Sequence, residues 1–586
     1  MDRNSIIGFV LIALLLFVYF MWFGPSPELV KQPLVADTLK TQSINPVVES
    51  ATVSAQDTLF KSNDVTEEEI VIENEDIKLT LSNKGAVIRQ AELKQYKTYS
   101  QKPLILVDQS RSRFSLEGNF KGSTINLYQP TYRFNKTTVG DSTQVEFVTN
   151  SDVTGEIRHT YTLGKSGYQI KYKISAAGAS GKALTFNWFN RLPLVEKDIV
   201  DSRTKTSVNY YTAADEFEDF ADGSLETDET DIPSVKWVAS RQKFFVSGFL
   251  TKGAFNGGKL KSTVDASDSS TVKNTELLVK IPVSDVTSGK GSFSFYIGPN
   301  DYKTLEDVAP GFRKNIDLGW PPVKYVNQFL IVPVFQLLTK YLTNYAVIII
   351  LMVMLIRVIL LPLTYKSYLG MAKMRLLKPE LDELKKKHEG DQVKFSQEQM
   401  KLFNEAGASP FSGCIPLLLQ MPFLFAMFFL FPGCIEFRQQ TLPFVEDIST
   451  YDSVIKFGFS VPFLGSHLSI YTVLMTISTL IIQWQNNQIS TVDGPMKSMG
   501  YIMPVIFLFI LNTFPASLNF YYLVSNLVSF GQQFLIRRFV DEDKIKRLMD
   551  EHRKKRATEG SSKSSFMSRL EGAMKASEEA RKKNKR

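Results

Sequence analysis

The stretch YAVIIILMVMLIRVILLPL, residues 345–363, decides the fold class of this chain. It is long and apolar enough to span a bilayer, yet Arg357 lies in its second half. A guanidinium at such a depth costs roughly 2.5–3.5 kcal/mol on insertion scales, so we expect it to face protein or water rather than lipid. Arg357 is therefore the first candidate functional residue.

A second interpretation of Arg357 stays open at this point. Its long side chain could reach the lipid headgroups beyond Pro362, because only about 9 Å of helix separates it from Leu363. The inward-facing interpretation is favoured, since later apolar segments carry polar stripes that could line a cavity with it.

Charge is distributed unevenly along the 586 residues, which carry a net charge of +8. Residues 24–339 contain 36 Lys and Arg against 38 Asp and Glu, whereas residues 537–586 contain 17 basic and 9 acidic residues. The basic tail suggests an anionic partner, either lipid headgroups or ribosomal RNA, with a merely solvated tail as the alternative. Cys414 and Cys434 lie at opposite ends of one apolar segment, too far apart for a disulfide.

The N-terminal part predicts a membrane anchor followed by a tether. Residues 5–23 form an apolar run preceded by Arg3. We interpret residues 1–23 as an uncleaved signal-anchor helix, with a cleaved signal peptide as the alternative. Residues 24–65 lack sustained periodicity and predict a flexible tether.

Residues 66–319 predict an all-β sandwich. Tyr168, Ile170, Tyr172 and Ile174 alternate with polar residues, and similar period-two patterns recur between turn signals across the region. Helix signals are few here, so a sandwich is the economical assignment.

Two helical segments flank the Arg357 stretch. Residues 320–343 resemble an amphipathic helix lying in the membrane interface, although a short core helix of the soluble domain would show the same pattern. Residues 365–408 are highly charged, with apolar residues at three- and four-residue intervals, and predict a helical hairpin outside the membrane.

Further apolar segments complete a polytopic membrane protein with six predicted transmembrane helices. They are residues 414–431, 468–484, 501–514 and 518–536. The segment 364–410 carries 9 Lys and Arg, whereas the connection 434–465 carries only Arg438 and Lys456, so the N-terminus, the hairpin and the tail 537–586 are predicted to be cytoplasmic. The β-sandwich would then lie in the periplasm of a bacterium, beyond an inner-membrane core of residues 344–536.

Polar residues in two of these segments fall on single helix faces. The first face contains Thr472, Thr476, Thr479 and Gln483, and the second contains Tyr522, Ser525, Ser529 and Gln532. Gln420, Asn512 and Thr513 add further donors and acceptors. These residues could hydrate a groove around Arg357, or they could simply hold the helices together by hydrogen bonds.

Signatures of enzymes and metal sites are absent from the sequence. The four histidines are not spaced as metal ligands, and no Gly-x-Ser-x-Gly or Cys-x-x-Cys motif occurs. We therefore expect neither catalysis nor a cofactor.

Five ordered motifs resemble those of the YidC-type membrane protein insertases, of the YidC/Oxa/Alb family. They are RVILLPLT (357–364), MAKMR (371–375), GCIPLLLQMP (413–422), MPVIF (503–507) and YYLVSNL (521–527). Weaker matches at residues 237–239, 298–299 and 319–320 are similar to the periplasmic domain of Gram-negative members.

The resemblance implies an insertase and chaperone that works without ATP on nascent membrane proteins. It implies a hydrophilic groove around Arg357, and the polar faces described above would line this groove with Gln420, Thr476, Gln483, Ser525 and Ser529. It further implies substrate contacts by Gln420, Phe423, Leu424, Tyr521 and Tyr522, and a mobile substrate-receiving element at residues 366–406. The Sec translocon, the ribosome and anionic lipids are the expected further partners, and DNA is not one.

Two other functions compete with this one. A secondary transporter or channel would also place a charge in a polar cavity, although its usual internal repeats are not evident. Alternatively, the β domain could be a carbohydrate-binding module anchored by the helices, because β-sandwiches host many functions.

Overall fold

The computed structural model describes residues 66–388, 391–408, 415–462, 464–489 and 495–559. They form two compact units. A β-rich unit comprises the described residues up to Asp317 together with Pro432–Gln440, and a helical unit comprises Leu318–Phe431 and the described residues from Thr441 onwards. The predicted anchor 1–23, the tether 24–65 and the end of the basic tail lie outside the described residues.

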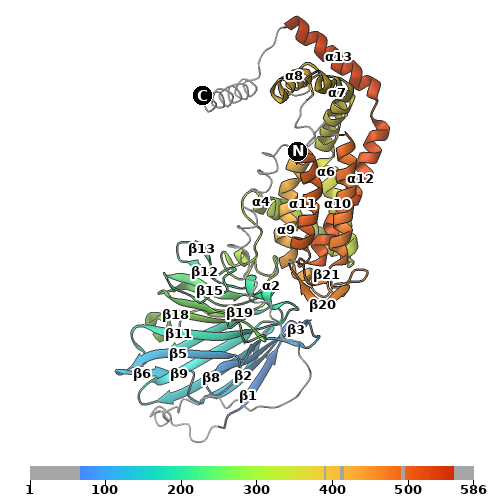
Figure 1. Cartoon of the computed structure of the whole chain (residues 1–586). Coiled ribbons are helices and arrows are strands. Elements are labelled where there is room, and N and C mark those ends of the chain that lie inside the picture. The colour runs from blue at the N-terminus through green and yellow to red at the C-terminus, as the bar shows by residue number, and fades with distance from the viewer. Residues whose placement is uncertain (1–65, 389–390, 409–414, 463, 490–494, 560–586) are drawn as a thin grey trace, which may run out of the picture. The chain divides into compact units, whose positions relative to one another are not determined.

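The β-rich unit is built from antiparallel sheets (Figure 1). The largest sheet contains, in spatial order, β13 (Phe217–Phe220), β12 (Ser207–Thr212), β15 (Val235–Arg241), β16 (Phe245–Phe255), β19 (Phe293–Pro299), β10 (Gln169–Ala176), β9 (Gly155–Leu163), β8 (Ser142–Ser151) and β7 (Arg133–Val139). A six-stranded sheet contains β14 (Asp228–Ile232), β17 (Gly258–Thr263), β18 (Thr271–Pro282), β11 (Ser180–Pro193), β5 (Ser112–Phe120) and β6 (Ser123–Asn126). A four-stranded sheet contains β1 (Glu69–Glu73), β2 (Ile77–Ser82), β3 (Val87–Lys97) and β4 (Pro103–Asp108), and the short helices are α2 (Ile199–Thr204) and α3 (Val283–Thr287).

One hydrophobic core is shared by these sheets. The alternation predicted around residue 170 is confirmed, because Ile170, Tyr172 and Ile174 of β10 are buried while Lys171 and Lys173 are exposed. Burial of one face of each strand is the main stabilising contribution expected for such a sheet.

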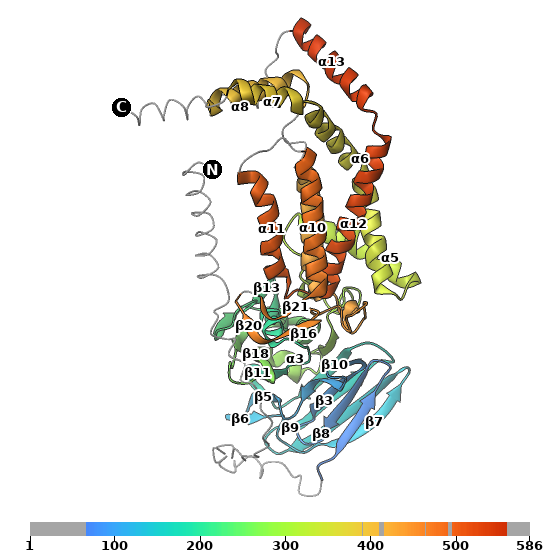
Figure 2. The same cartoon turned by 45° about the vertical axis from the view of Figure 1, so that its right-hand side comes forward.

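The helical unit contains α4 (Val323–Val326), α5 (Val332–Tyr341), α6 (Tyr345–Leu376), α7 (Lys378–Lys387), α8 (Gln392–Glu405), α9 (Ile415–Leu430), α10 (Ile470–Ile489), α11 (Pro495–Leu511), α12 (Ala516–Phe539) and α13 (Glu542–Glu559), with a hairpin of β20 (Ile455–Val461) and β21 (Gly465–Leu468). Helix α12 contacts α6 and α10, and α10 also contacts α11 (Figure 2). Among the described helices, α6 is the one long and apolar enough to cross a membrane by length and composition. Two shorter apolar helices cover Gln420–Gly433 and Gly500–Leu511.

Helix α6 continues past the predicted end of the membrane segment. The sequence interpretation ended the span at Leu363 and began the hairpin at residue 365, but α6 continues through Pro362 to Leu376. The hydroxyl of Thr364 donates to the carbonyl of Leu360 at 2.9 Å, one turn earlier in the same helix. The hairpin itself consists of α7 and α8.

The predicted amphipathic helix 320–343 is not one regular helix. It begins at Val323 and contains a π-helical turn, Asn327–Ile331, between α4 and α5. The buried amide of Asn327 donates to the carbonyls of Leu318 and Ala426, both at 3.0 Å, which explains a polar residue on the inner face. The exposed face is largely apolar and includes Tyr325, Phe329, Leu337 and Tyr341.

The predicted span 501–514 is shifted along the chain. Helix α11 ends at Leu511, so Asn512 and Thr513 lie beyond the helix that forms most of this span. The side-chain amide of Asn512 donates to the carbonyls of Leu464 and His467, both at 2.9 Å, and its oxygen accepts from the backbone N–H of Ser469. Asn512 therefore holds the β20–β21 hairpin against the start of α10.

The hairpin and α13 share a small hydrophobic cluster. It contains Met374, Leu377, Leu381, Phe403, Ala406, Ala408, Ile545 and Met549. Arg553 of α13 also donates to the carboxylate of Glu380 at 2.9 Å. The described start of the basic tail is thus a helix packed on the hairpin.

Candidate functional site

Arg357 is enclosed by α6, α9 and α12. Its Nη1 donates to Gln420 Oε1 at 3.2 Å, and its Nη2 donates to the Ser525 hydroxyl at 2.6 Å and to the Ser525 carbonyl at 3.2 Å. These bonds favour the inward-facing interpretation over a side chain that extends to the headgroups. They also explain why polar residues occur in these apolar segments, since one polar residue on each neighbouring helix bonds the guanidinium.

The charge of Arg357 is solvated by neutral groups. An amide, a hydroxyl and a carbonyl accept from it, and within the described part of the chain no carboxylate lies at ion-pair distance. A guanidinium has five N–H donors, more than these three bonds use. A site of this kind can stabilise an incoming negative charge by a charge-assisted hydrogen bond.

Helix α12 presents the predicted stripe toward α6 and α9. Ser529 donates to the Ser525 carbonyl at 2.7 Å, which places two hydroxyls one turn apart beside Arg357. The Tyr522 hydroxyl donates to the Leu424 carbonyl of α9 at 3.4 Å, so the stripe also spans the gap between α12 and α9.

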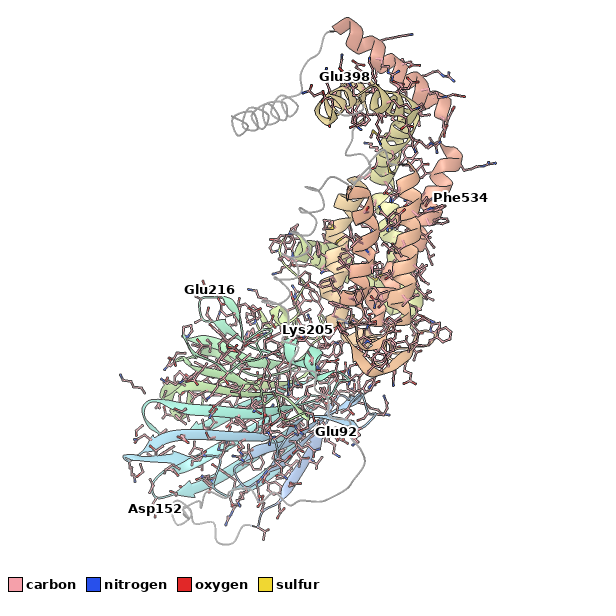
Figure 3. The ribbon with its side chains drawn as sticks, viewed as in Figure 1. Glu92, Asp152, Lys205, Glu216, Glu398 and Phe534 are labelled. Atoms are coloured by element: carbon pink, nitrogen blue, oxygen red, sulfur yellow. The ribbon has the colours of Figure 1, made fainter. Side chains whose placement is uncertain are left out.

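The four predicted substrate-contact residues differ in exposure. Phe423 and Leu424 of α9, and Tyr522 of α12, are partly exposed, whereas Tyr521 is buried. The Tyr521 ring packs edge-on against Phe431 and Tyr522, with centroids 5.7 and 5.5 Å apart. Tyr521 therefore supports Tyr522 from within the bundle. On the outer side of α12, Phe534 is 65% exposed (Figure 3).

The polar stripe of α10 lies elsewhere. The hydroxyl of Thr476 donates to the Thr472 carbonyl of its own helix at 2.8 Å, and Gln483 bonds Asn487 at 3.3 Å and lies against Gly500 of α11. Neither side chain bonds Arg357. Among the predicted groove residues, the structure thus brings together Arg357, Gln420, Ser525 and Ser529, and leaves Thr476 and Gln483 apart.

Two asparagines missed in the sequence explain the α10 stripe. Asn519 donates to the Thr472 hydroxyl at 2.7 Å, and Asn526 donates to the hydroxyls of Ser478 and Thr479 at 2.9 and 2.8 Å. Their spacing of seven residues on α12 was the available signal, because two turns of helix return to the same face. The alternative of interhelical bonding therefore holds for α10.

Replacing Asn526 with alanine should loosen this α10–α12 seam without changing the Arg357 site. Interhelical hydrogen bonds in membranes average about 0.6 kcal/mol, so the loss of two predicts about 1 kcal/mol of bundle stability. Thermal denaturation in detergent would measure it. Substrate preference should stay unchanged, and a variant that alters preference between acidic and neutral substrates would contradict the assignment of Asn526 to the seam.

Comparison with known proteins completes the description of the site. The family described as "60Kd inner membrane protein" matches residues 337–544, and that described as "YidC periplasmic domain" matches residues 69–337. The membrane protein insertase YidC of Amoebophilus asiaticus is 40% identical over 594 residues, covering 98% of this chain and 99% of the relative. That of Cytophaga hutchinsonii is 40% identical over 622 residues, covering 99% of this chain and 98% of the relative.

A solved structure of YidC from Thermotoga maritima aligns with 79% of this chain and 98% of its own length. Its TM-score is 0.26 at 13% identity, too low to add to the sequence relationship.

Proposed function

Because this chain belongs to the YidC family of membrane protein insertases, we propose that it receives nascent hydrophobic segments in a hydrophilic groove beside Arg357 and releases them into the bilayer without nucleotide hydrolysis. The family is one of inner-membrane proteins, and its members are named as insertases rather than enzymes. The transporter and carbohydrate-module alternatives are not favoured by any of these relationships.

The observation that carries the proposal is the neutral solvation of Arg357 by Gln420 and Ser525. A positive charge held by neutral groups attracts acidic or polar residues at the outer end of a substrate helix. The same polar groups replace hydrogen bonds that the substrate's polar segment gives up when it leaves water. Meanwhile, transfer of the apolar face into lipid contributes about 25 cal/mol per Å² and favours release.

Substrate contact is assigned to Phe423 and Leu424 on α9 and Tyr522 on α12, with Tyr521 holding Tyr522 in place. Ser529 extends the polar surface by one helical turn from Ser525. Thr476 and Gln483, included in the groove by sequence, are now assigned to the packing of α10.

The membrane arrangement is also a proposal. Six spans with both ends in the cytoplasm agree with the basic residues of segment 364–410 and of the tail 537–586. The β-rich unit would then be periplasmic. The exposed apolar face of α4 and α5 suits the membrane interface. Ribosomes, the Sec translocon and anionic lipids remain the proposed partners of the cytoplasmic surfaces.

Photocrosslinking to a ribosome-bound nascent membrane helix tests the proposal. Probes at Gln420, Leu424 and Tyr522 should react with the nascent helix, whereas a probe at the outward-facing Phe534 should react far less. Equal reaction at all four positions, or none, would contradict a substrate site between α9 and α12.

A further inference from the structure

The segment that follows α9, Pro432–Gln440, belongs to the β-rich unit, although the residues on both sides of it belong to the helical unit. Ile435 lies in the hydrophobic core of the β-rich unit, and Phe437 is fully buried. A connection between two membrane segments would ordinarily lie on the surface. The connection after α9 instead packs into the interior of the β-rich unit.

Arg438 makes the main polar contact of the segment. Its Nε donates to Glu196 Oε1 at 2.9 Å, and the exposed fractions of the two side chains are only 3% and 11%. The guanidinium also lies over the ring of Phe245, 5.3 Å from its centroid. Since removal of one partner would leave a buried charge uncompensated, this pair holds the segment far more firmly than an exposed pair could.

Gln439 adds a second attachment point. Its side-chain amide donates to the carbonyls of Lys97 and Thr98, at 3.1 and 3.0 Å, where β3 ends. Glu196 follows β11 and Phe245 begins β16. Three separate parts of the β-rich unit therefore contact the adjacent residues Arg438 and Gln439.

We infer that Arg438 and Gln439 form a latch, which fixes the connection after α9 within the β-rich unit and so restrains the last turns of α9. Helix α9 ends at Leu430, and the short helical turns Phe431–Gly433 and Ile435–Phe437 take up most of the connection to Arg438. Because so few residues outside these turns connect α9 to Arg438, fixing Arg438 restricts the motion of the last turns of α9. Arg438 is a positioning residue in this scheme, because it acts through α9 and touches no substrate.

The inference rests on the proposed function, since α9 carries Gln420 and Leu424. By restraining the end of α9, the latch would limit the motion of the helix that offers these residues to a substrate. It gives the β-rich unit a part in insertion that requires no ligand of its own.

Hydrogen exchange of the full-length protein in nanodiscs, read by mass spectrometry, tests the latch in Arg438→Ala and in the milder Glu196→Gln. We expect exchange in residues 432–440 and in the last turns of α9 to accelerate about tenfold, while α6 and α12 stay unchanged. Arg158→Ala is the matched control, because it removes exposed ion pairs with Glu146 and Glu156 in the same unit. If Arg438→Ala fails to fold, Glu196→Gln carries the test.

A parallel crosslinking measurement links the latch to insertion. In both latch variants, crosslinks from a probe at Leu424 should fall about threefold relative to those at Tyr522, since only α9 is released. Faster exchange confined to residues 432–440, with α9 unaffected, would overturn the latch. If the wild-type protein gives no crosslinks at all, the proposed function fails, and exchange at the end of α9 still decides whether the latch exists.

Discussion

Insertion of substrates with acidic translocated segments should fall about tenfold or more when Arg357 is replaced by alanine. A hydrogen bond to a charged group contributes roughly 1.5–3 kcal/mol, and each 1.4 kcal/mol corresponds to a factor of ten. Neutral substrates lose only contact with a polar surface and no hydrogen bond between charged groups, so their insertion should fall far less. The measurement is insertion into proteoliposomes of one substrate in matched acidic and neutral versions.

Arg357→Lys is the control that separates charge from geometry. Lysine keeps the positive charge but cannot reproduce the fork that bonds Gln420 and Ser525 together. We expect it to restore most of the discrimination between the two substrates and only part of the rate. Equal losses for acidic and neutral substrates in Arg357→Ala would exclude an electrostatic role and leave Arg357 as a structural link between α6, α9 and α12.

The sequence predicted the centre of this site because helical periodicity is local. Arg357 was conspicuous as a cation in an apolar run, and the spacing of Tyr522, Ser525 and Ser529 defined one face of α12. Which neighbouring helix a given face contacts is not determined by local sequence. Whether the polar stripe of α10 met Arg357 or another face of α12 depended on Asn519 and Asn526, which bond Thr472 and Thr479 of α10.

The latch was beyond sequence reasoning for the same physical reason. Arg438 appeared only as one of two basic residues in a connection between spans, and its partner Glu196 is 242 residues away. No period relates the two positions. Likewise, the burial of the Asn327 amide depends on two carbonyls, of Leu318 and Ala426, that only the folded chain brings within reach.

The β-rich unit contains a buried histidine whose ionisation should control its acid stability. His159 accepts at Nδ1 from the Tyr172 hydroxyl at 2.8 Å, and its Nε2 lies 3.1 Å from the Tyr132 hydroxyl. Because Tyr132 donates its own proton to the Leu127 carbonyl, and Tyr128 donates to Tyr172, the neutral ring must carry its proton on Nε2. The network is complete only with a neutral imidazole.

Burial lowers the pKa of His159 from 6.5 to about 3. Between these two pH values, the unfolded chain therefore binds a proton at His159, whereas the folded chain leaves His159 neutral. The contribution to stability is fully present above about pH 6.5 and is lost as the pH falls toward 3, at up to about 1.4 kcal/mol per pH unit. Lowering the pH from 6 to 4 should reduce the free energy of unfolding of the β-rich unit by about 2–3 kcal/mol through this one residue.

His159→Gln should flatten this pH dependence. A glutamine amide can donate and accept much as neutral histidine does but does not titrate, so the variant should lose about 1 kcal/mol at pH 7.5 and regain relative stability at pH 4.5. Urea unfolding reports it through Trp188 and Trp237, both buried in this unit, with the other three of the five tryptophans replaced by phenylalanine. Carboxylates that titrate elsewhere affect both proteins alike and cancel in the difference. Parallel stability curves for wild type and variant from pH 7.5 to 4.5 would show that His159 takes up a proton within the folded unit at little cost, and would contradict the neutral network.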